Sequence, residues 1–425
     1  MAGNKTKGFG TLPVFFTAIS TILGAILFLR FGMAVGHVGF WGVILVILIG
    51  HTVTIPTALA LSELATNRRV EGGGEYFVIS RSFGLNIGTT IGISLFFSQA
   101  ISVAFYVIAF TEAFEPFFNY ALENWDLNLP RQVISLPAMG LLSLLILKRG
   151  ASMGVKALYF VVAILFASLT LFFLGQTDYV PEQSIWTIGQ GTYDLSSFFI
   201  VFAIVFPAFT GMTAGVGLSG DLRKPARSIP LGTTLATLSG MVIYIFIAWK
   251  LYTSASPEDL KNNQLIMSKI AIYGALVIPL GLAASTISSA LGSVMVAPRT
   301  LQALAMDRAF PAKRFNRWLA RGKGDMNEPY NASLITCLIA FIFVAAGNVN
   351  AVAEIISMFF MVTYGSLCLI SFLFHFGADP SYRPVFRSKW YISLIGFIMC
   401  GWLMFKINSL YAILAIAALV LIYLG

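Results

Sequence analysis

One stretch of this chain decides its fold: Phe202-Ala203-Ile204-Val205-Phe206-Pro207-Ala208-Phe209-Thr210-Gly211-Met212-Thr213-Ala214-Gly215. It sets proline, threonine and glycine residues inside an apolar segment that is long enough to cross a bilayer. A helix interrupted in hydrocarbon exposes carbonyl groups on one side of the break and N–H groups on the other. Such groups are tolerated only where they line a cavity or bind something. Because the two half-helix ends carry opposite partial charges, a single break can hold a cation and an anion.

The composition predicts an all-α integral membrane protein. The chain has 425 residues, of which 58% are hydrophobic and 11% are charged, and its mean hydropathy is +0.84. No soluble domain is so apolar, and the first span is followed by others without a cleavage-site pattern, which argues against a removable signal peptide. Repeated apolar stretches indicate about twelve transmembrane helices. They are expected near residues 12–36, 40–65, 86–114, 131–147, 154–174, 195–218, 230–252, 267–297, 331–346, 351–376, 391–406 and 408–424.

The charged residues alternate between loops in a way that predicts the orientation of the chain. The net charge is +9, and basic residues gather in every second loop, at residues 5–7, 68–69, 148–156, 223–227, 308–323 and 383–389. By the positive-inside rule, both termini are expected in the cytoplasm, with the protein in the plasma membrane or in a prokaryotic inner membrane. Because topology accounts for the charge, the expected partners are the lipid bilayer and small ions, and not a nucleic acid.

A second interruption is expected in the first span, around Ser20, Thr21 and Gly24. The alternative is a continuous helix, because serine and threonine in membrane helices can hydrogen-bond to the preceding turn. The position favours a break, since spans one and six correspond if spans one to five and six to ten are inverted halves. Paired interruptions at matching positions are the best sequence indication of a transport site near the bilayer midplane.

Between spans two and three, residues 69–77 carry three consecutive glycines flanked by charges. This is not a phosphate-binding loop, because no strand precedes the glycines and no Gly-Lys-Ser/Thr follows them. We expect instead a conformationally permissive cytoplasmic loop before a re-entrant helix.

Side chains with oxygen atoms in three further spans are the candidate ligands. Tyr106 and Tyr364 lie well inside spans three and ten, although a membrane tyrosine can also belong to an interfacial belt. A phenol oxygen suits a large cation such as potassium, and a tyrosine hydroxyl can donate to an anion. Span eight carries small residues on one helical face, namely Ser285, Ser288, Ser289, Gly292 and Ser293. This stripe favours either close helix packing or hydroxyl ligands for sodium.

Two charged residues, Arg30 and Glu112, lie at the expected outer ends of spans one and three. Charges at such positions often anchor a helix by extending to the membrane surface. If both side chains face the vestibule, they are expected to pair and to act as an outer gate.

Several motifs carry a family resemblance: Leu27-Phe28-Leu29-Arg30, Gly72-Gly73-Gly74-Glu75-Tyr76-Phe77-Val78-Ile79-Ser80-Arg81-Ser82, Tyr106-Val107-Ile108-Ala109-Phe110-Thr111-Glu112, Pro207-Ala208-Phe209-Thr210-Gly211, Ser219-Gly220-Asp221-Leu222 and Ala297-Pro298-Arg299. With them, the chain resembles the cation–chloride cotransporters of the amino acid–polyamine–organocation superfamily, and looks closest to the sodium–potassium–chloride branch. The resemblance implies a 5+5 inverted-repeat core with broken helices one and six. It also implies two additional helices, which often form homodimers in that family.

The resemblance also implies ion sites. Potassium would be held by Tyr106, the Thr210 hydroxyl and the carbonyl groups of Thr21, Ile22 and Pro207. Sodium would be held by the Ser288 and Ser289 hydroxyls, with carbonyl groups from around Ser20, Leu23 and Ser285. One chloride would lie near the N–H groups of Gly24, Ala25 and Ile26. A second chloride would lie on those of Gly211, Met212 and Thr213, with the Tyr364 hydroxyl. Arg30 and Glu112 match the family's outer ion pair.

The chain departs from the family pattern in a few residues and in length. Thr21 stands where asparagine is typical and Leu23 where tryptophan is typical, while Ser285 replaces an alanine and adds a hydroxyl. The family's large cytoplasmic domains are missing from this sequence. We therefore expect one transmembrane transporter domain over residues 1–425, with a core at 10–376, extra helices at 390–425 and no soluble regulatory domain. So short a version suggests a prokaryotic source.

The sequence leaves three functions open. The first is an electroneutral symporter that moves chloride with sodium and potassium by alternating access. The second is an amino-acid or amine permease of the same fold, whose substrate carboxylate would take the N–H groups assigned to chloride. The third is a membrane scaffold or sensor without transport, which is disfavoured because breaks without ligands are costly. No catalytic constellation is present, so we expect no enzyme, no cofactor and no metal beyond sodium and potassium.

Overall fold

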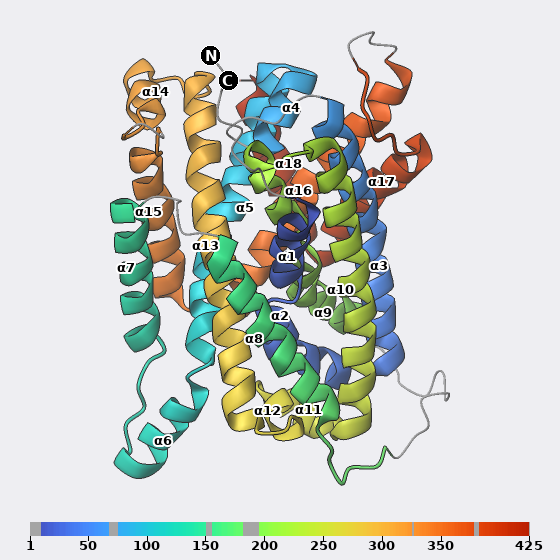
Figure 1. Ribbon diagram of the computed structural model, residues 1–425, viewed down its shortest axis with the longest axis vertical. Helices are drawn as coiled ribbons and strands as arrows, with labels where there is room; N and C mark the ends of the chain where they lie inside the picture. Colours follow the sequence, from blue (N-terminus) through green and yellow to red (C-terminus); the bar gives the residue numbers. More distant parts are fainter. Residues whose placement is uncertain are drawn as a thin grey trace.

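The computed structural model describes residues 10–67, 75–149, 155–181, 195–324, 327–377 and 382–424. Across these ranges the chain is built from helices (Figure 1). The first half contains α1 (Thr11–Ile22), α2 (Ala25–Leu29), α3 (Phe31–Asn67), α4 (Glu75–Phe83), α5 (Leu85–Glu112), α6 (Glu115–Trp125), α7 (Gln132–Arg149) and α8 (Val155–Leu174). The second half contains α9 (Leu195–Val205), the 3-10 helices η1 (Phe206–Phe209) and η2 (Gly211–Asp221), α10 (Pro225–Ser254), α11 (Pro257–Asn262), α12 (Ile266–Ile270), α13 (Gly274–Met306), α14 (Lys313–Ala320), α15 (Tyr330–Ala346) and α16 (Val349–Phe376). The chain continues through α17 (Trp390–Ile407) and α18 (Ser409–Leu424).

The helices agree with a multi-pass membrane protein. Within the described ranges, eight helical stretches are long and apolar enough to cross a membrane, and α7, α8 and α15 are shorter apolar helices. Together with α18, these helices account for the spans expected from the apolar stretches. The expected all-α membrane class is confirmed.

Single residues with a left-handed backbone mark two boundaries between helical spans. Gly39 has a φ of 66° and a ψ of 179° inside α3, and this kink separates the first two expected spans. The left-handed φ favours glycine because it has no Cβ. The expected start of span eight at residue 267 is wrong, since α12 ends at Ile270, Tyr273 is left-handed and α13 begins at Gly274. The apolar composition continues through that turn, so hydropathy alone does not reveal it.

The packing repeats between the two halves of the core, as expected for inverted repeats. The contact of α1 with α10 corresponds to that of α9 with α3, and the contact of α5 with α16 corresponds to that of α13 with α8. The short helix α4 packs on α5, and its counterpart α12 packs on α13. Figure 1 shows α4 and α12 at opposite ends of the molecule, so the two halves run in opposite directions.

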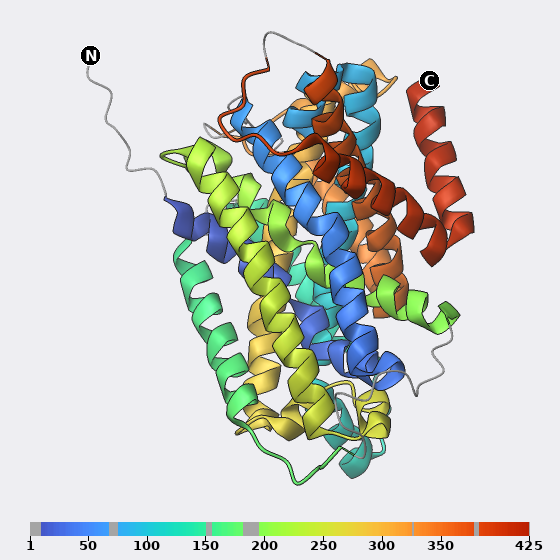
Figure 2. The same ribbon diagram turned by 90° about the vertical axis from the view of Figure 1, so that its right-hand side faces the viewer.

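The last two helices lie on one side of this core (Figure 2). Helix α17 packs on α3, α9 and α16, and α18 packs on α17, α5 and α16. Helices α17 and α18 therefore lie beside the helices whose packing repeats between the two halves.

A buried histidine, with a buried glutamate beside it, joins the core to the segment that leads into α17. The two ring nitrogens of His375 lie 2.8 Å and 3.0 Å from the carbonyl oxygens of Ser371 and Ser388. The Glu63 carboxylate lies 3.7 Å from this ring and accepts a 2.8 Å hydrogen bond from the Ser371 hydroxyl. The pair therefore ties α3 to α16.

Candidate ion site between two broken helices

The first break separates α1 from α2 at Leu23 and Gly24. Leu23 has a φ of −80° and a ψ of 47°, and Gly24 is extended, with a φ of −88° and a ψ of −156°. The helix therefore stops and restarts, as expected from the sequence. Because α2 is a new helix start, its first N–H groups have no partners inside the helix.

The second break is more gradual than the first. Helix α9 ends at Val205, η1 covers Phe206–Phe209, and η2 begins at Gly211. A 3-10 helix has poorer hydrogen-bond geometry than an α-helix and is usually short. At Thr210, between η1 and η2, the hydroxyl donates a 2.8 Å hydrogen bond to the Pro207 carbonyl oxygen.

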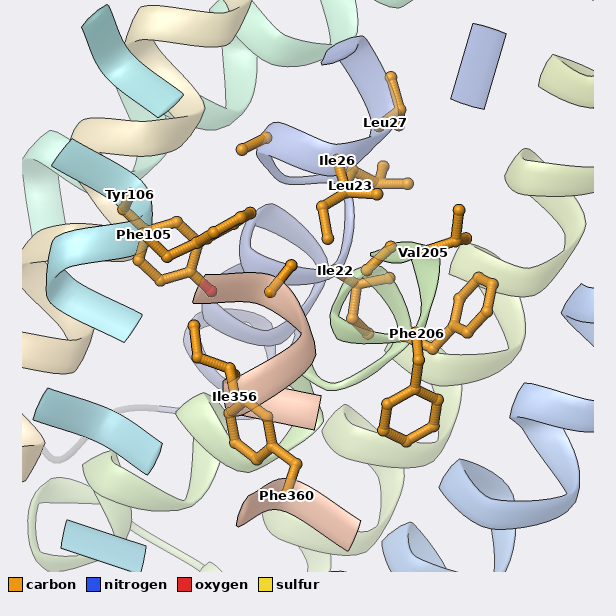
Figure 3. Packing of buried hydrophobic residues seen from close by; sticks show 14 of the residues in the cluster. Ile22, Leu23, Ile26, Leu27, Phe105, Tyr106, Val205, Phe206, Ile356 and Phe360 are labelled. Atoms are coloured by element: carbon orange, nitrogen blue, oxygen red, sulfur yellow. The ribbon is translucent and has the colours of Figure 1, made fainter. Parts of the chain in front are cut away.

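The two breaks touch each other through their backbones. A Cβ added to Gly211 would lie 2.5 Å from the Ile22 nitrogen and 2.7 Å from the Thr21 carbonyl carbon. Only glycine allows so close an approach. Figure 3 shows Ile22 and Leu23 in one buried cluster with Val205 and Phe206 of the second break. The residues predicted to hold potassium from these two spans therefore meet at one place.

Tyrosines from two other spans donate to carbonyl groups at the breaks. The Tyr244 hydroxyl on α10 donates a 2.5 Å hydrogen bond to the Ile22 carbonyl oxygen. The Tyr364 hydroxyl on α16 donates a 2.6 Å hydrogen bond to the Thr210 carbonyl oxygen. Since each carbonyl oxygen has two lone pairs, one lone pair of each remains available to a cation.

Tyr106 lies at the same centre, on α5. In Figure 3 its hydroxyl points away from α5 into the cluster that holds Ile22 and Leu23. It is close enough to Tyr244 for an electrostatic interaction, and it lies beside Ser289 of α13. The phenol oxygen thus faces the candidate cation site and not the membrane interface.

The residues predicted to hold sodium divide into two groups. Ser285 donates a 3.4 Å hydrogen bond to the Leu23 carbonyl oxygen, which joins α13 to the first break. Ser289, one turn later, is 2% exposed, and its hydroxyl has no hydrogen-bond partner of normal geometry among the described residues. Ser288 is only half-buried. The Ser20 hydroxyl bonds to the Thr17 carbonyl oxygen at 3.1 Å, within its own helix.

The candidate anion positions are the starts of α2 and η2. Gly24 directly precedes α2, Ala25 and Ile26 begin it, and Gly211, Met212 and Thr213 begin η2. Tyr364 differs from the expectation, because its single hydroxyl hydrogen is already donated to Thr210. An anion at the start of η2 would have to draw this hydrogen away from the Thr210 carbonyl oxygen.

The expected ion pair of Arg30 with Glu112 is not formed. Arg30 donates a 2.7 Å hydrogen bond to the Asn350 side chain, and Glu112 lies 3.7 Å from Arg131. Arg30 still interacts electrostatically with Glu112, so the two face the same region. Asn350 lies 320 residues from Arg30 in the sequence, whereas Arg131 follows Glu112 in the segment that leads into α7.

Two further residues at the site were not predicted. Tyr244 lies well inside its apolar span, which is the same signal that identified Tyr106 and Tyr364. Glu75, at the start of α4, contacts the Thr213 side chain. Its position after three glycines favoured a loop and gave no indication of this contact.

Comparisons with known proteins agree with this architecture. A family model described as "Amino acid permease" matches residues 13–425. Solute carrier family 12 member 2 of Mus musculus is 32% identical over 458 residues, which cover 95% of this chain and 37% of that protein. Solute carrier family 12 member 1 of Mus musculus is 32% identical over 443 residues, which cover 91% of this chain and 40% of that protein.

A third relative is named the bumetanide-sensitive sodium-(potassium)-chloride cotransporter of Manduca sexta. It is 28% identical over 470 residues, which cover 97% of this chain and 43% of that protein. The chain therefore spans less than half the length of these relatives, and the expected resemblance to cation–chloride cotransporters is confirmed. Because the family model covers almost the whole chain, the protein belongs to the amino acid permease family.

Proposed function

We propose that this protein is a secondary symporter that moves chloride together with sodium and potassium. The observation that carries the proposal is the buried Ser289 hydroxyl, which lies beside the Tyr106 phenol, next to the breaks, and makes no hydrogen bond of normal geometry among the described residues. A buried polar group without a partner costs about 1–3 kcal/mol, and a cation at this position would remove that cost. Sodium prefers compact oxygen ligands such as the hydroxyls of Ser285 and Ser289.

Potassium and chloride would occupy the two sides of the meeting point. Potassium would lie among the Tyr106 phenol, the Thr210 hydroxyl and the carbonyl groups of Thr21, Ile22 and Pro207. Chloride would lie on the N–H groups at the starts of α2 and η2, where the partial charge is positive. The name of the Manduca sexta relative supports this choice of ions.

Balanced loading of cations and chloride would make the transport cycle electroneutral. Moving one uncompensated charge costs about 2.3 kcal/mol per 100 mV, and balanced loading removes this cost. The two inverted halves support an alternating-access cycle, in which one half moves against the other around the site.

Ion-substitution uptake in proteoliposomes tests the proposal. Uptake of labelled sodium and rubidium should fall to the level of empty liposomes when external chloride is replaced by gluconate. Rubidium serves as the probe for the potassium site. Cation uptake that is indifferent to chloride would contradict the proposed symport.

An amino-acid permease is the second candidate, because the matching family model carries that description. A substrate carboxylate would bind the same N–H groups as chloride. This function predicts uptake of an amino acid without any need for chloride, and thermal stabilisation by the amino acid but not by chloride.

A further inference from the structure

A buried carboxylate lies beside the candidate anion site at the start of η2. Glu75 is the first residue of α4, and its side chain is 7% exposed. It contacts Thr213, and it interacts electrostatically with Tyr364. Its Oε2 atom is buried without a hydrogen-bond partner among the described residues.

No cation in the described part of the chain compensates this carboxylate. Arg81, on the same helix, forms a 3.1 Å ion pair with Asp307, which also accepts a 2.8 Å hydrogen bond from Tyr76. Of the helices packed against α4, α16 contributes Tyr364 and η2 contributes Thr213. Helix α13 ends at Met306, and Asp307, which follows it, is the residue already paired with Arg81.

The other two helices packed against α4 carry one acidic residue each that has its own partners away from Glu75. On α3, Glu63 is paired with His375 and Ser371. On α5, Glu112 lies at the end of the helix and faces Arg131. Among the described residues, an ionised Glu75 would therefore be a buried charge without a cationic partner, which is costly.

Burial raises the pKa of Glu75 to about 7, against a smaller opposing effect of the Thr213 contact. The carboxyl is therefore neutral below about pH 7 and charged above it. The neutral acid has a hydrogen to donate, whereas the carboxylate can only accept.

The two forms of Glu75 affect a neighbouring anion in opposite ways. A carboxylate would repel chloride and compete with it for the Thr213 hydroxyl. A neutral acid removes the repulsion and leaves that hydroxyl free to donate to chloride. By linkage, the factor by which a proton strengthens chloride binding equals the factor by which chloride strengthens proton binding.

We propose that Glu75 is a proton-binding site coupled to the anion site formed by Gly211, Met212 and Thr213, so that chloride binds there together with a proton. This inference rests on the proposed chloride site. It assigns a role to α4, at the end of the molecule opposite α12 (Figure 1).

Chloride titrations of the purified full chain test the coupling. Chloride affinity should be constant below about pH 7 and should fall about tenfold per pH unit above it. Glu75→Gln, which stays neutral, should bind chloride with the low-pH affinity at every pH. Glu123→Gln, an exposed carboxylate on α6, is the control and should keep the full pH dependence.

A second measurement needs no variant. Chloride added to the weakly buffered protein at about pH 8 should be accompanied by proton uptake from solution, detected with a pH dye. Chloride binding without proton uptake and with the same affinity on both sides of pH 7 would overturn the coupling and leave the chloride site in place. No chloride binding at any pH would overturn both this inference and the proposed function.

Discussion

The two broken spans correspond in the inverted repeat, yet the groups around them differ. The first break is abrupt, and hydroxyl groups engage the carbonyls at its end: Tyr244 bonds to Ile22 and Ser285 to Leu23. The second break extends through two 3-10 helices, and Tyr364 bonds to Thr210. Beyond it lies the Glu75 carboxyl.

This difference assigns separate chemistry to the two breaks. At the first break, the side chains that bond to the carbonyl groups are neutral hydroxyls, so they add no charge that changes with pH. The second break combines N–H groups with an acidic group, and this combination suits an anion only while the acid is neutral. Contact between Gly211 and the backbone of Thr21 and Ile22 couples the two environments.

We expect the largest effect on stability and uptake from a substitution that pushes the two breaks apart. In Gly211→Ala, the new Cβ would lie 2.5 Å from a backbone atom that cannot move alone. Overpacking of this kind costs about 1–3 kcal/mol, so we expect a lower melting temperature and loss of uptake.

Gly292→Ala is the matched control, because an added Cβ there meets nothing within 4 Å. Its stability should be unchanged or should rise by up to about 1 kcal/mol, since alanine favours helices. Equal destabilisation in both variants would show that contact between the breaks is not the cause.

A smaller effect should separate the two serines assigned to sodium. Removing a hydroxyl that contacts a charge costs about 1.5–3 kcal/mol, so Ser289→Ala should raise the sodium concentration for half-maximal uptake at least tenfold. Ser288→Ala should have a weaker effect, because Ser288 is half-buried. If Ser288→Ala had the larger effect, the sodium site would lie on the face of α13 that carries Ser288, and the assignment to Ser289 would be wrong.

The smallest effect should distinguish the tyrosines at the two breaks. Each of Tyr244→Phe and Tyr364→Phe removes one hydrogen bond, worth about 1 kcal/mol or roughly fivefold in affinity. Tyr244→Phe should weaken rubidium dependence, and Tyr364→Phe should weaken chloride dependence as well. The exposed Tyr391→Phe is the control. Identical ion dependence in both site variants would mean that the breaks are not chemically distinct.

Much of this arrangement could be predicted from the sequence, because its signals are local. Proline, threonine and glycine inside an apolar span marked the second break. Ser20, Thr21 and Gly24 marked the first break, together with its matching position in the repeat, and the positions of Tyr106 and Tyr364 far from span ends marked those two tyrosines. Pairings between distant elements could not be predicted in this way. Arg30 and Glu112 have the right charges to pair, but the fold brings Asn350 and Arg131 closer to them.

Burial explains the other residues that were missed. His375 stands alone in the sequence and becomes part of a pair only where α16 packs on α3. Glu75 follows three consecutive glycines in the sequence, a pattern that predicts a loop, and a carboxylate in a loop is ordinarily solvated. Only the packing of α4 on η2 and α16 shows that this carboxylate is enclosed.

Chloride uptake driven by a sodium gradient is the most direct test of joint binding at the two breaks. Labelled chloride should accumulate in proteoliposomes containing rubidium on both sides, and to the same extent at zero potential and at about 100 mV negative inside. No accumulation, or an accumulation that the potential lowers by an order of magnitude or more, would contradict electroneutral symport through this site.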